Sequence, residues 1–313
     1  MSFKVIGIGE VLWDLFPSGP QLGGAPANFA YHAHALGARA GVITRVGKDS
    51  YGTEIRSRLA EQKIESVIVQ VDETAPTGTV TVSLSGNGIP HFNIHENVAW
   101  DRLAVTEEAL AAVRQADAIC FGTLAQRSEP SRSTIRELLQ EAKLASLKIL
   151  DINLRQQFYN REVIEQSLGL ANVLKLNEAE LPMLCDMFKI NGDLKQRIVS
   201  LAKSFELAVI ALTMGPKGSI LYQNGRWSEC PARSVEVKDT VGAGDSFTAA
   251  LVMGLLRKMD LDHINFAANE IAQYVCTCAG ATPLLPNELR ALAAGARRPV
   301  TNMNQAVLAT KAE

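Results

Sequence analysis

Short apolar runs alternate with longer amphipathic segments along most of the 313 residues. The short runs are largely uninterrupted by polar positions, which is typical of strands buried on both faces of a parallel sheet. The predicted strands are Lys4–Ile8, Gly41–Arg45, Val67–Val71, Ala118–Phe121, Lys148–Ile152, Val173–Leu176, Ala208–Thr213 and Ser219–Tyr222.

The segments between these runs carry apolar residues at helical spacing. They predict helices over Ala27–Leu36, Gly52–Gln62, Glu107–Arg114, Ser131–Ala145, Glu178–Phe188 and Asp193–Phe205, and another helix follows Gly244. A regular alternation of strand and helix predicts a doubly wound α/β fold, in which a mostly parallel sheet is flanked by helices.

Two stretches, Leu12–Pro17 and Thr79–Glu96, break the alternation. They are extended and rich in turn residues, and Gly86-Asn87-Gly88 predicts a hairpin between Thr79–Ser85 and Pro90–Ile94. We therefore expect a small antiparallel lid beside the main sheet. The predicted organisation is a core of residues 1–11, 24–75 and 98–295, a lid of residues 12–23 and 76–97, and a weakly patterned tail of residues 296–313. Because no helix is predicted to cover the lid, we expect a homodimer joined through two lids.

Composition narrows the class of protein. Hydrophobic residues make up 47% and charged residues 20%, and the net charge of −2 gives no sign of a nucleic-acid or anionic-membrane partner. No apolar run approaches the length of a transmembrane helix. The five cysteines are odd in number and scattered, which is typical of reduced thiols in a cytoplasmic protein.

The segment Asp239–Phe247 carries the most informative chemistry. Its glycines permit a tight turn with bare backbone N–H groups, and the start of the following helix adds unpaired donors that suit an anion. Asp245 would then lie beside a bound phosphate, where a carboxylate can take a proton from an attacking hydroxyl. This combination predicts phosphoryl transfer.

A second glycine-rich segment, Gly23–Asn28, precedes a predicted helix. It is either a plain loop with proline in the first helical turn or a place where a polar ligand touches the backbone while Asn28 bonds a hydroxyl. Asp14, just upstream, could accept hydrogen bonds from two hydroxyls of one sugar, although a lone aspartate is usually only solvated.

Polar residues also follow three predicted strands. Asn177 and Glu180 have the spacing of a capping box, and Glu180 could also hold water on a magnesium ion. Residues 213–218 form either a β-turn or a nucleotide contact. Arg155, after the strand that ends near Asp151, is a plausible contact for an anion or substrate.

Other phosphate-binding and metal motifs are excluded. The sequence has neither a Walker-type loop nor a dinucleotide fingerprint. His91 and His95 lie four residues apart on a predicted strand, a poor spacing for a shared metal.

Together these motifs resemble the PfkB (ribokinase-like) family of ATP-dependent carbohydrate kinases over about residues 4–290. Asp239–Phe247 is similar to the family's C-terminal signature and Gly23–Gly47 to its N-terminal one. Three segments are similar to the fructokinase branch of the family: Glu10–Asp14 with the glycine-rich segment, Phe121–Ala125, and Asp151-x-Asn153-x-Arg155.

The resemblance implies a role for each matching residue. The catalytic residues are Asp245 as base with Gly242, Ala243 and Gly244 as the anion hole; the sugar-binding residues are Asp14, Gly24, Asn28 and Arg155; the nucleotide-binding residues are Lys175, Asn177, Thr213, Gly215, Gly218 and Asn269. The implied cofactors are ATP and Mg²⁺, with Glu180 governing the magnesium. A K⁺ site is implied near Asp239, where Cys278 and Leu284 depart from the ligand positions of some members.

The sequence therefore predicts an ATP-dependent sugar kinase that phosphorylates a primary hydroxyl, with fructose as the expected substrate. One alternative is a 2-keto-3-deoxygluconate kinase, in which Arg155 meets the substrate carboxylate. Another is a non-catalytic sugar-binding protein on the same fold, against which the presence of both Asp239 and Asp245 argues.

Overall fold

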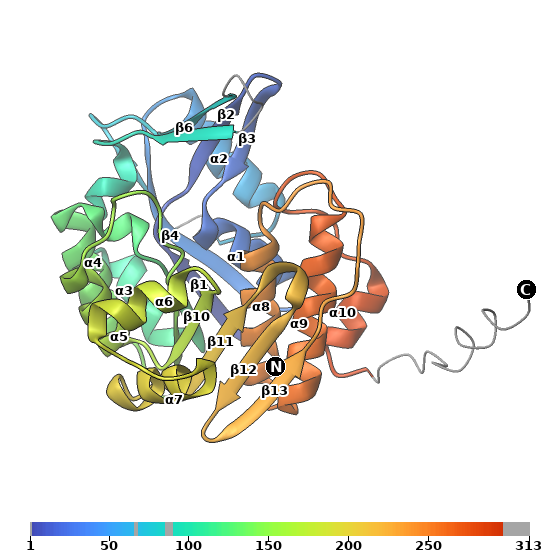
Figure 1. The fold of residues 1–313 in the computed structure, drawn as a ribbon. Coiled ribbons are helices and arrows are strands. Elements are labelled where there is room, and N and C mark those ends of the chain that lie inside the picture. The colour runs from blue at the N-terminus through green and yellow to red at the C-terminus, as the bar shows by residue number, and fades with distance from the viewer. Residues whose placement is uncertain (1, 66–67, 85–89, 297–313) are drawn as a thin grey trace, which may run out of the picture.

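The computed structural model describes residues 2–65, 68–84 and 90–296. Within them, a nine-stranded sheet has the order β13-β12-β11-β10-β9-β8-β1-β4-β5 (Figure 1). Its pairs are parallel from β5 to β11, and only β12 and β13 at one edge run antiparallel to their neighbours. The strands are β1 (Lys4–Ile8), β4 (Arg39–Gly47), β5 (Val69–Asp72), β8 (Ala118–Phe121), β9 (Leu147–Asp151), β10 (Val173–Asn177), β11 (Val209–Thr213), β12 (Ser219–Gln223) and β13 (Arg226–Cys230).

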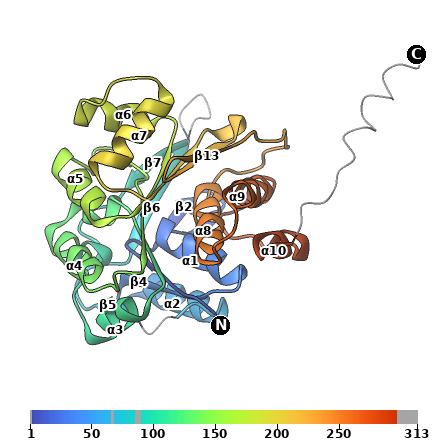
Figure 2. The same ribbon diagram turned by 90° about the horizontal axis from the view of Figure 1, so that it is seen from below.

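Helices cover both faces of this sheet (Figure 2). One face packs against α3 (Glu107–Gln115), α4 (Glu129–Gln140), α5 (Arg161–Leu170), α6 (Glu180–Phe188) and α7 (Leu194–Ser204). The other packs against α1 (Ala25–Ala35), α2 (Ser50–Glu61), α8 (Ala243–Leu256), α9 (Leu261–Cys276) and α10 (Asn287–Ala293). Alternate residues of β1 serve the two cores: Ile6 and Ile8 join the first, and Val5 joins the second. This is why its apolar run is continuous.

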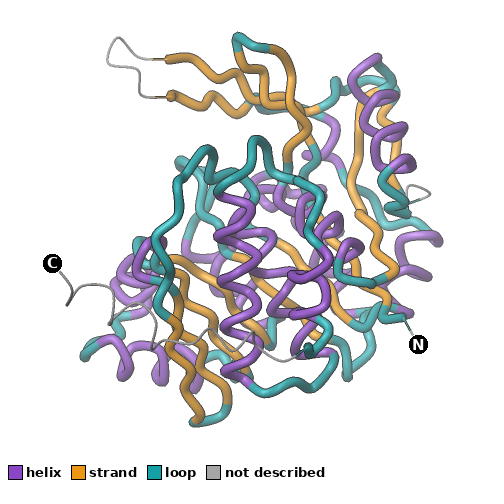
Figure 3. The backbone as a smooth tube through the Cα atoms, turned by 90° about the vertical axis from the view of Figure 1, so that its right-hand side faces the viewer, coloured by secondary structure: helices purple, strands orange, loops and turns teal. Residues whose placement is uncertain are grey.

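A second, smaller sheet projects over one edge of the body (Figure 3). Its order is β3-β2-β6-β7, with β2 (Leu12–Phe16), β3 (Gly19–Gly23), β6 (Gly78–Leu84) and β7 (Pro90–Ile94). The pairs β2–β3 and β6–β7 are antiparallel, as expected for the lid, and β2 and β6 join them through a parallel pairing that the sequence did not predict. The predicted turn at Gly86-Asn87-Gly88 and the tail from 297 onward lie outside the described residues.

All eight predicted strands are present, with small differences at their ends. The helix predicted over Ser131–Ala145 spans Glu129–Gln140 instead, because Pro130 fits its first turn and Leu144, which prolonged the apolar pattern, is 99% exposed.

The described elements that were not predicted include α5, α9, α10, β3 and β13. In α9 the pattern is broken by Asn265 and Asn269, which are buried because they hydrogen-bond to serines of the antiparallel edge. The strand β13 lies at that edge and is largely polar, so it lacks the apolar run of a central strand.

All five cysteines lie among the described residues, and none of them forms a disulfide bond. Across the described ranges, no helix combines the length and apolar character needed to span a membrane.

Candidate active site

A cleft of about 620 Å³ lies between the carboxyl ends of the central parallel strands and the smaller sheet. Polar side chains reach it from several elements. They are Glu10 after β1, Asp14 on β2, Asn28 on α1, Asn153 and Arg155 after β9, Lys175 on β10, and Asp245 on α8. The carboxyl edge of a parallel sheet is the usual place for a ligand in open α/β folds.

One wall of the cleft is the turn that begins α8. Gly242 has a left-handed φ of 78°, and a Cβ there would lie 2.4 Å from the carbonyl oxygen of Ala281, so only glycine fits. No side chain caps the N-terminus of α8. The Ala243 N–H donates to the Thr240 carbonyl oxygen at 3.3 Å, so the following first-turn N–H groups, beginning with Gly244, offer donors and a partial positive charge to an anion.

Asp245 follows this turn in the first turn of α8. Its Oδ2 accepts a 2.8 Å hydrogen bond from the side-chain amide of Asn28. Burial and, to a smaller extent, the Asp151 carboxylate together raise the pKa of Asp245 to about 6, against the opposing effects of the Asn28 hydrogen bond and the charges of Lys175 and Arg155. A carboxylate with a pKa just below neutrality is ionised at neutral pH and suited to accept a proton.

Lys175 carries the buried positive charge of the site. Its ammonium Nζ lies 3.1 Å from Oδ1 of Asp151, and Thr248 donates to the other carboxylate oxygen at 2.9 Å. A Cβ placed on Gly244 would lie 3.0 Å from the same Nζ, so the ammonium lies directly against the anion-binding turn. Burial alone would lower the pKa of Lys175, but the carboxylates of Asp151, Glu180 and Asp245 raise it above its usual value, and the amine is charged.

The predicted sugar-binding residues Asp14, Gly24, Asn28 and Arg155 all line the same cleft. Asp14 is half-buried, and burial raises its pKa to about 6 against the opposing charge of Arg155. Gly24, with φ 111°, begins α1, and a Cβ there would lie 2.5 Å from the carbonyl oxygen of Glu10. Arg155 is exposed, and its guanidinium donates only a 3.3 Å bond to the Leu154 carbonyl, which leaves most of its donors open to the cleft.

Most of the predicted nucleotide-binding residues do not line this cleft. Lys175 does, whereas Asn177, Thr213, Gly215, Gly218 and Asn269 lie outside it. Gly218 is held by backbone geometry, since a Cβ there would lie 2.0 Å from the Cys230 carbonyl oxygen. The Asn269 amide donates to Ser219 and Asn265 inside the protein. At both positions the residue type is explained by contacts inside the protein, without a nucleotide.

Glu180 and Asn177 form the capping box that their spacing predicts. The Asn177 N–H donates to Oε2 of Glu180 at 2.8 Å, and the Glu180 N–H donates to Oδ1 of Asn177 at 3.0 Å. The other Glu180 oxygen accepts the Leu154 N–H at 2.9 Å. Each oxygen keeps a second lone pair, so Glu180 fits magnesium through a coordinating water.

No preformed metal cluster of His, Cys, Asp or Glu side chains occurs among the described residues. Near the proposed K⁺ position, the Asp239 carboxylate accepts the N–H groups of Val241 and Gly280. The two ring nitrogens of His95 bond to the hydroxyl groups of Thr79 and Thr81.

Four residues of the site were given no role by the sequence analysis. Asp151 bonds the Lys175 ammonium, Thr248 donates to Asp151, and Glu10 and Asn153 line the cleft. Asp151 and Glu10 both lie at or just after the carboxyl end of a predicted strand, a signal that could have identified them. Thr248 lies inside an apolar helix, where nothing in the sequence distinguishes it from a packed residue.

The chain is similar to known proteins along most of its length. The family model described as pfkB family carbohydrate kinase matches residues 20–288. A fructokinase of Klebsiella pneumoniae is 30% identical over 91% of this chain and 97% of its own length. A protein of Pyrococcus horikoshii, named as a sugar kinase and solved in complex with ATP, has a TM-score of 0.77 at 28% identity, over 92% of this chain and 99% of that one. A fructokinase of Xylella fastidiosa with bound ATP shares the fold with a TM-score of 0.82 at 20% identity, over 93% of this chain and 98% of that one.

Proposed function

The chain belongs to the pfkB family of carbohydrate kinases, and we propose that it is a fructokinase, which transfers the γ-phosphoryl group of ATP to D-fructose to give fructose 6-phosphate. The observation that carries the proposal is the position of Asp245, which lies beside the uncapped start of α8, bonds to Asn28 and lines the same cleft as Asp14. Support for fructose comes from the fructokinase relative that matches nearly the whole chain.

In the proposed reaction, the primary hydroxyl of the sugar attacks the γ-phosphorus and gives its proton to the Asp245 carboxylate. The bond from phosphorus to the bridging oxygen breaks, and ADP leaves. The first-turn N–H groups of α8 and the Lys175 ammonium offset the negative charge of the transferred group. Mg²⁺ bound to the nucleotide would supply further positive charge, with Glu180 holding one of its waters.

A second candidate rests on Arg155. Its guanidinium reaches the cleft with open donors, and a bidentate pair with a carboxylate would suit an acidic sugar such as 2-keto-3-deoxygluconate. Four carboxyl groups line the cleft and its inner hollow, namely Glu10, Asp14, Asp151 and Asp245. They would repel the carboxylate of an acidic sugar, and this favours a neutral sugar as the substrate.

The test is an assay of ADP release over a panel of neutral sugars and keto-acids. We expect fructose to give the highest kcat/KM. Turnover of 2-keto-3-deoxygluconate at ten times the kcat/KM of fructose, about 1.4 kcal/mol of transition-state preference, would favour the second candidate. No ADP release with any acceptor would favour a non-catalytic sugar-binding protein.

We also propose that the sheet β3-β2-β6-β7 is a lid over the cleft and that two copies join through it. A sheet normally buries both faces or leaves only one to solvent. Tyr51 and Arg58 of α2 pack on Trp13 of β2, whereas Phe92 of β7 is 41% exposed and offers apolar surface to a second copy. Sedimentation at micromolar concentration, with and without sugar, should give a dimer, and a monomer in both conditions would refute the pairing.

A further inference from the structure

Glu10 is a buried carboxylate that the reaction described above does not use. It lies just past the end of β1 and is 5% exposed. Its Oε2 has no hydrogen-bond partner in the part of the chain that the structure describes. Burial raises the pKa of Glu10 to about 7, with the Asp245 charge adding to the rise and the backbone N–H groups of Glu10 and Ala25 opposing it. A buried carboxylate oxygen without a donor costs free energy, so a retained one points to a partner that arrives from outside.

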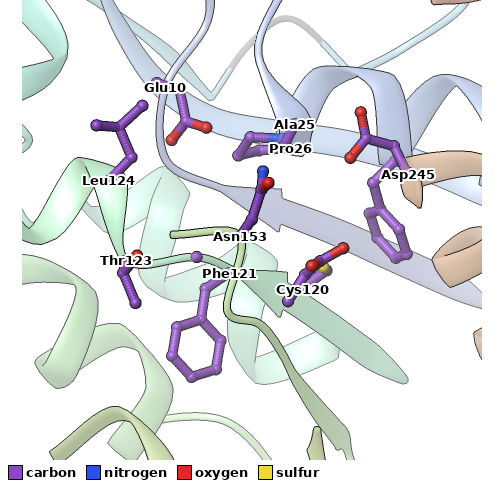
Figure 4. A pocket seen from close by; sticks show the side chains of 12 residues that line it. Glu10, Ala25, Pro26, Cys120, Phe121, Thr123, Leu124, Asn153 and Asp245 are labelled. Atoms are coloured by element: carbon purple, nitrogen blue, oxygen red, sulfur yellow. The ribbon is translucent and has the colours of Figure 1, made fainter. Parts of the chain in front are cut away.

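The carboxyl faces a small hollow that continues the cleft inward. Glu10, Asn153 and Asp245 line both spaces, and Ala25 and Pro26 form an apolar wall of the hollow. Figure 4 shows the Glu10 carboxyl and the Asn153 amide pointing toward the same space beside these two residues. The volume of about 10 Å³ is close to the least room that one water molecule needs. One hydroxyl group of a larger ligand therefore fits where a whole sugar ring does not.

The backbone at Asn153 supports a functional role for this hollow. Its φ is +40°, in the left-handed region that asparagine tolerates better than most residues. The amide offers two N–H donors and one acceptor oxygen, so Glu10 and Asn153 together can accept from and donate to the same hydroxyl.

We propose that Glu10 is a specificity-determining residue, whose Oε2 accepts a hydrogen bond from a hydroxyl of the acceptor sugar other than the one that is phosphorylated, with Asn153 as the matching donor. The inference rests on the proposed function and narrows its substrate to a neutral polyhydroxy sugar. A carboxylate in this hollow would meet Glu10 and Asp245 at once, and like charges at such a site are rejected.

The test combines removal of single hydroxyl groups from the sugar with mutation of Glu10. Fructose and its 1-, 3- and 4-deoxy analogues are compared as substrates of the wild-type enzyme and of Glu10→Gln, which keeps the shape of the side chain and removes its charge. With the wild type, one analogue should lose about 10- to 100-fold in kcat/KM, the usual effect of removing a hydrogen bond to a charged group. With Glu10→Gln, fructose itself should lose a similar factor, mostly through KM, and that one analogue should lose little more. Glu141→Gln, at an exposed ion pair with Arg114, serves as the matched control with unchanged discrimination.

The proposal would be overturned if Glu10→Gln lowered kcat/KM by the same factor for fructose and for every deoxy analogue. If the hollow holds only water, the mutation is not coupled to any one hydroxyl of the sugar. If Glu10→Ala is also made and does not fold, the isosteric variant still decides the question, and calorimetric binding of fructose without ATP gives a second readout. If the wild type prefers a different sugar, the proposed function fails, and the same cycle with deoxy forms of that sugar still tests Glu10.

Discussion

Asn28 and Asp245 lie 217 positions apart in the chain, yet the Asn28 amide donates a 2.8 Å hydrogen bond to the Asp245 carboxylate. Asn28 belongs to α1 and Asp245 to α8, two helices that lie side by side on one face of the sheet (Figure 2). Both residues line the cleft. The bond fixes the orientation of the proposed base and stabilises its ionised form, and it joins the proposed sugar contact to the proposed chemistry.

Asp245→Asn should lower kcat by about 10²–10⁴, because the amide cannot take the proton while the start of α8 stays nearly isosteric. The KM for ATP should change little. In the wild type, kcat should fall as the pH drops through about 6, where protonation removes the base. Steady-state kinetics from pH 5 to pH 9 check both points, with the exposed Asp186→Asn as control. Near wild-type turnover by Asp245→Asn would exclude Asp245 as the base.

Asp14→Ala should raise the KM for the sugar about tenfold and leave the KM for ATP near its wild-type value, since the side chain lines the cleft from β2, outside the main core. Because Asp14 is half-buried with a pKa raised to about 6, losing the charge should not lower the Tm at pH 8. Kinetics and a thermal melt on one preparation separate the two effects. Unfolding of the variant would show a structural role instead.

Arg155→Met should reduce kcat/KM for an acidic sugar by about 10- to 100-fold, the effect of a lost charge-assisted pair, and reduce that for fructose much less. The two substrates are compared in one assay, with Arg56→Met on α2 as an exposed control. Equal losses for both substrates would mean that Arg155 acts on the site as a whole and does not recognise a carboxylate.

Glu10→Gln should stabilise the protein at high pH. The folded pKa of about 7 lies above the ordinary value of 4.5, so the folded state holds the proton more tightly than the unfolded state. The stability that this proton contributes is fully present below about pH 4.5 and is lost as the pH rises through 7. The free energy of unfolding of Glu10→Gln minus that of the wild type should therefore be about 1–3 kcal/mol larger at pH 8 than at pH 4. Urea unfolding at the two pH values measures this, and a difference that does not change with pH would contradict the burial of an ionisable Glu10.

The elements that position the site could largely be predicted from the sequence. A central parallel strand is buried on both faces, so β1 and β8 appear as continuous apolar runs whatever their neighbours are, and β10 is interrupted only where Lys175 enters the site. The turn at Gly242 is equally local, because its left-handed backbone demands glycine. The elements that were missed depend on other parts of the chain: β13 is a polar edge strand, and α9 buries asparagines that β12 and β13 satisfy.

Local periodicity and backbone conformation are therefore enough to predict the central strands, most of the helices between them, the anion-binding turn and the types of side chain at the strand ends. Which of those side chains share one cleft depends on the tertiary structure. It brought Lys175 to Asp151 and against Gly244, joined Asn28 to Asp245, and left Oε2 of Glu10 without a hydrogen-bond partner among the residues that the structure describes. It also set the pKa values of Glu10, Asp14 and Asp245, because these depend on the loss of water and on charges that residues far apart in the chain bring together.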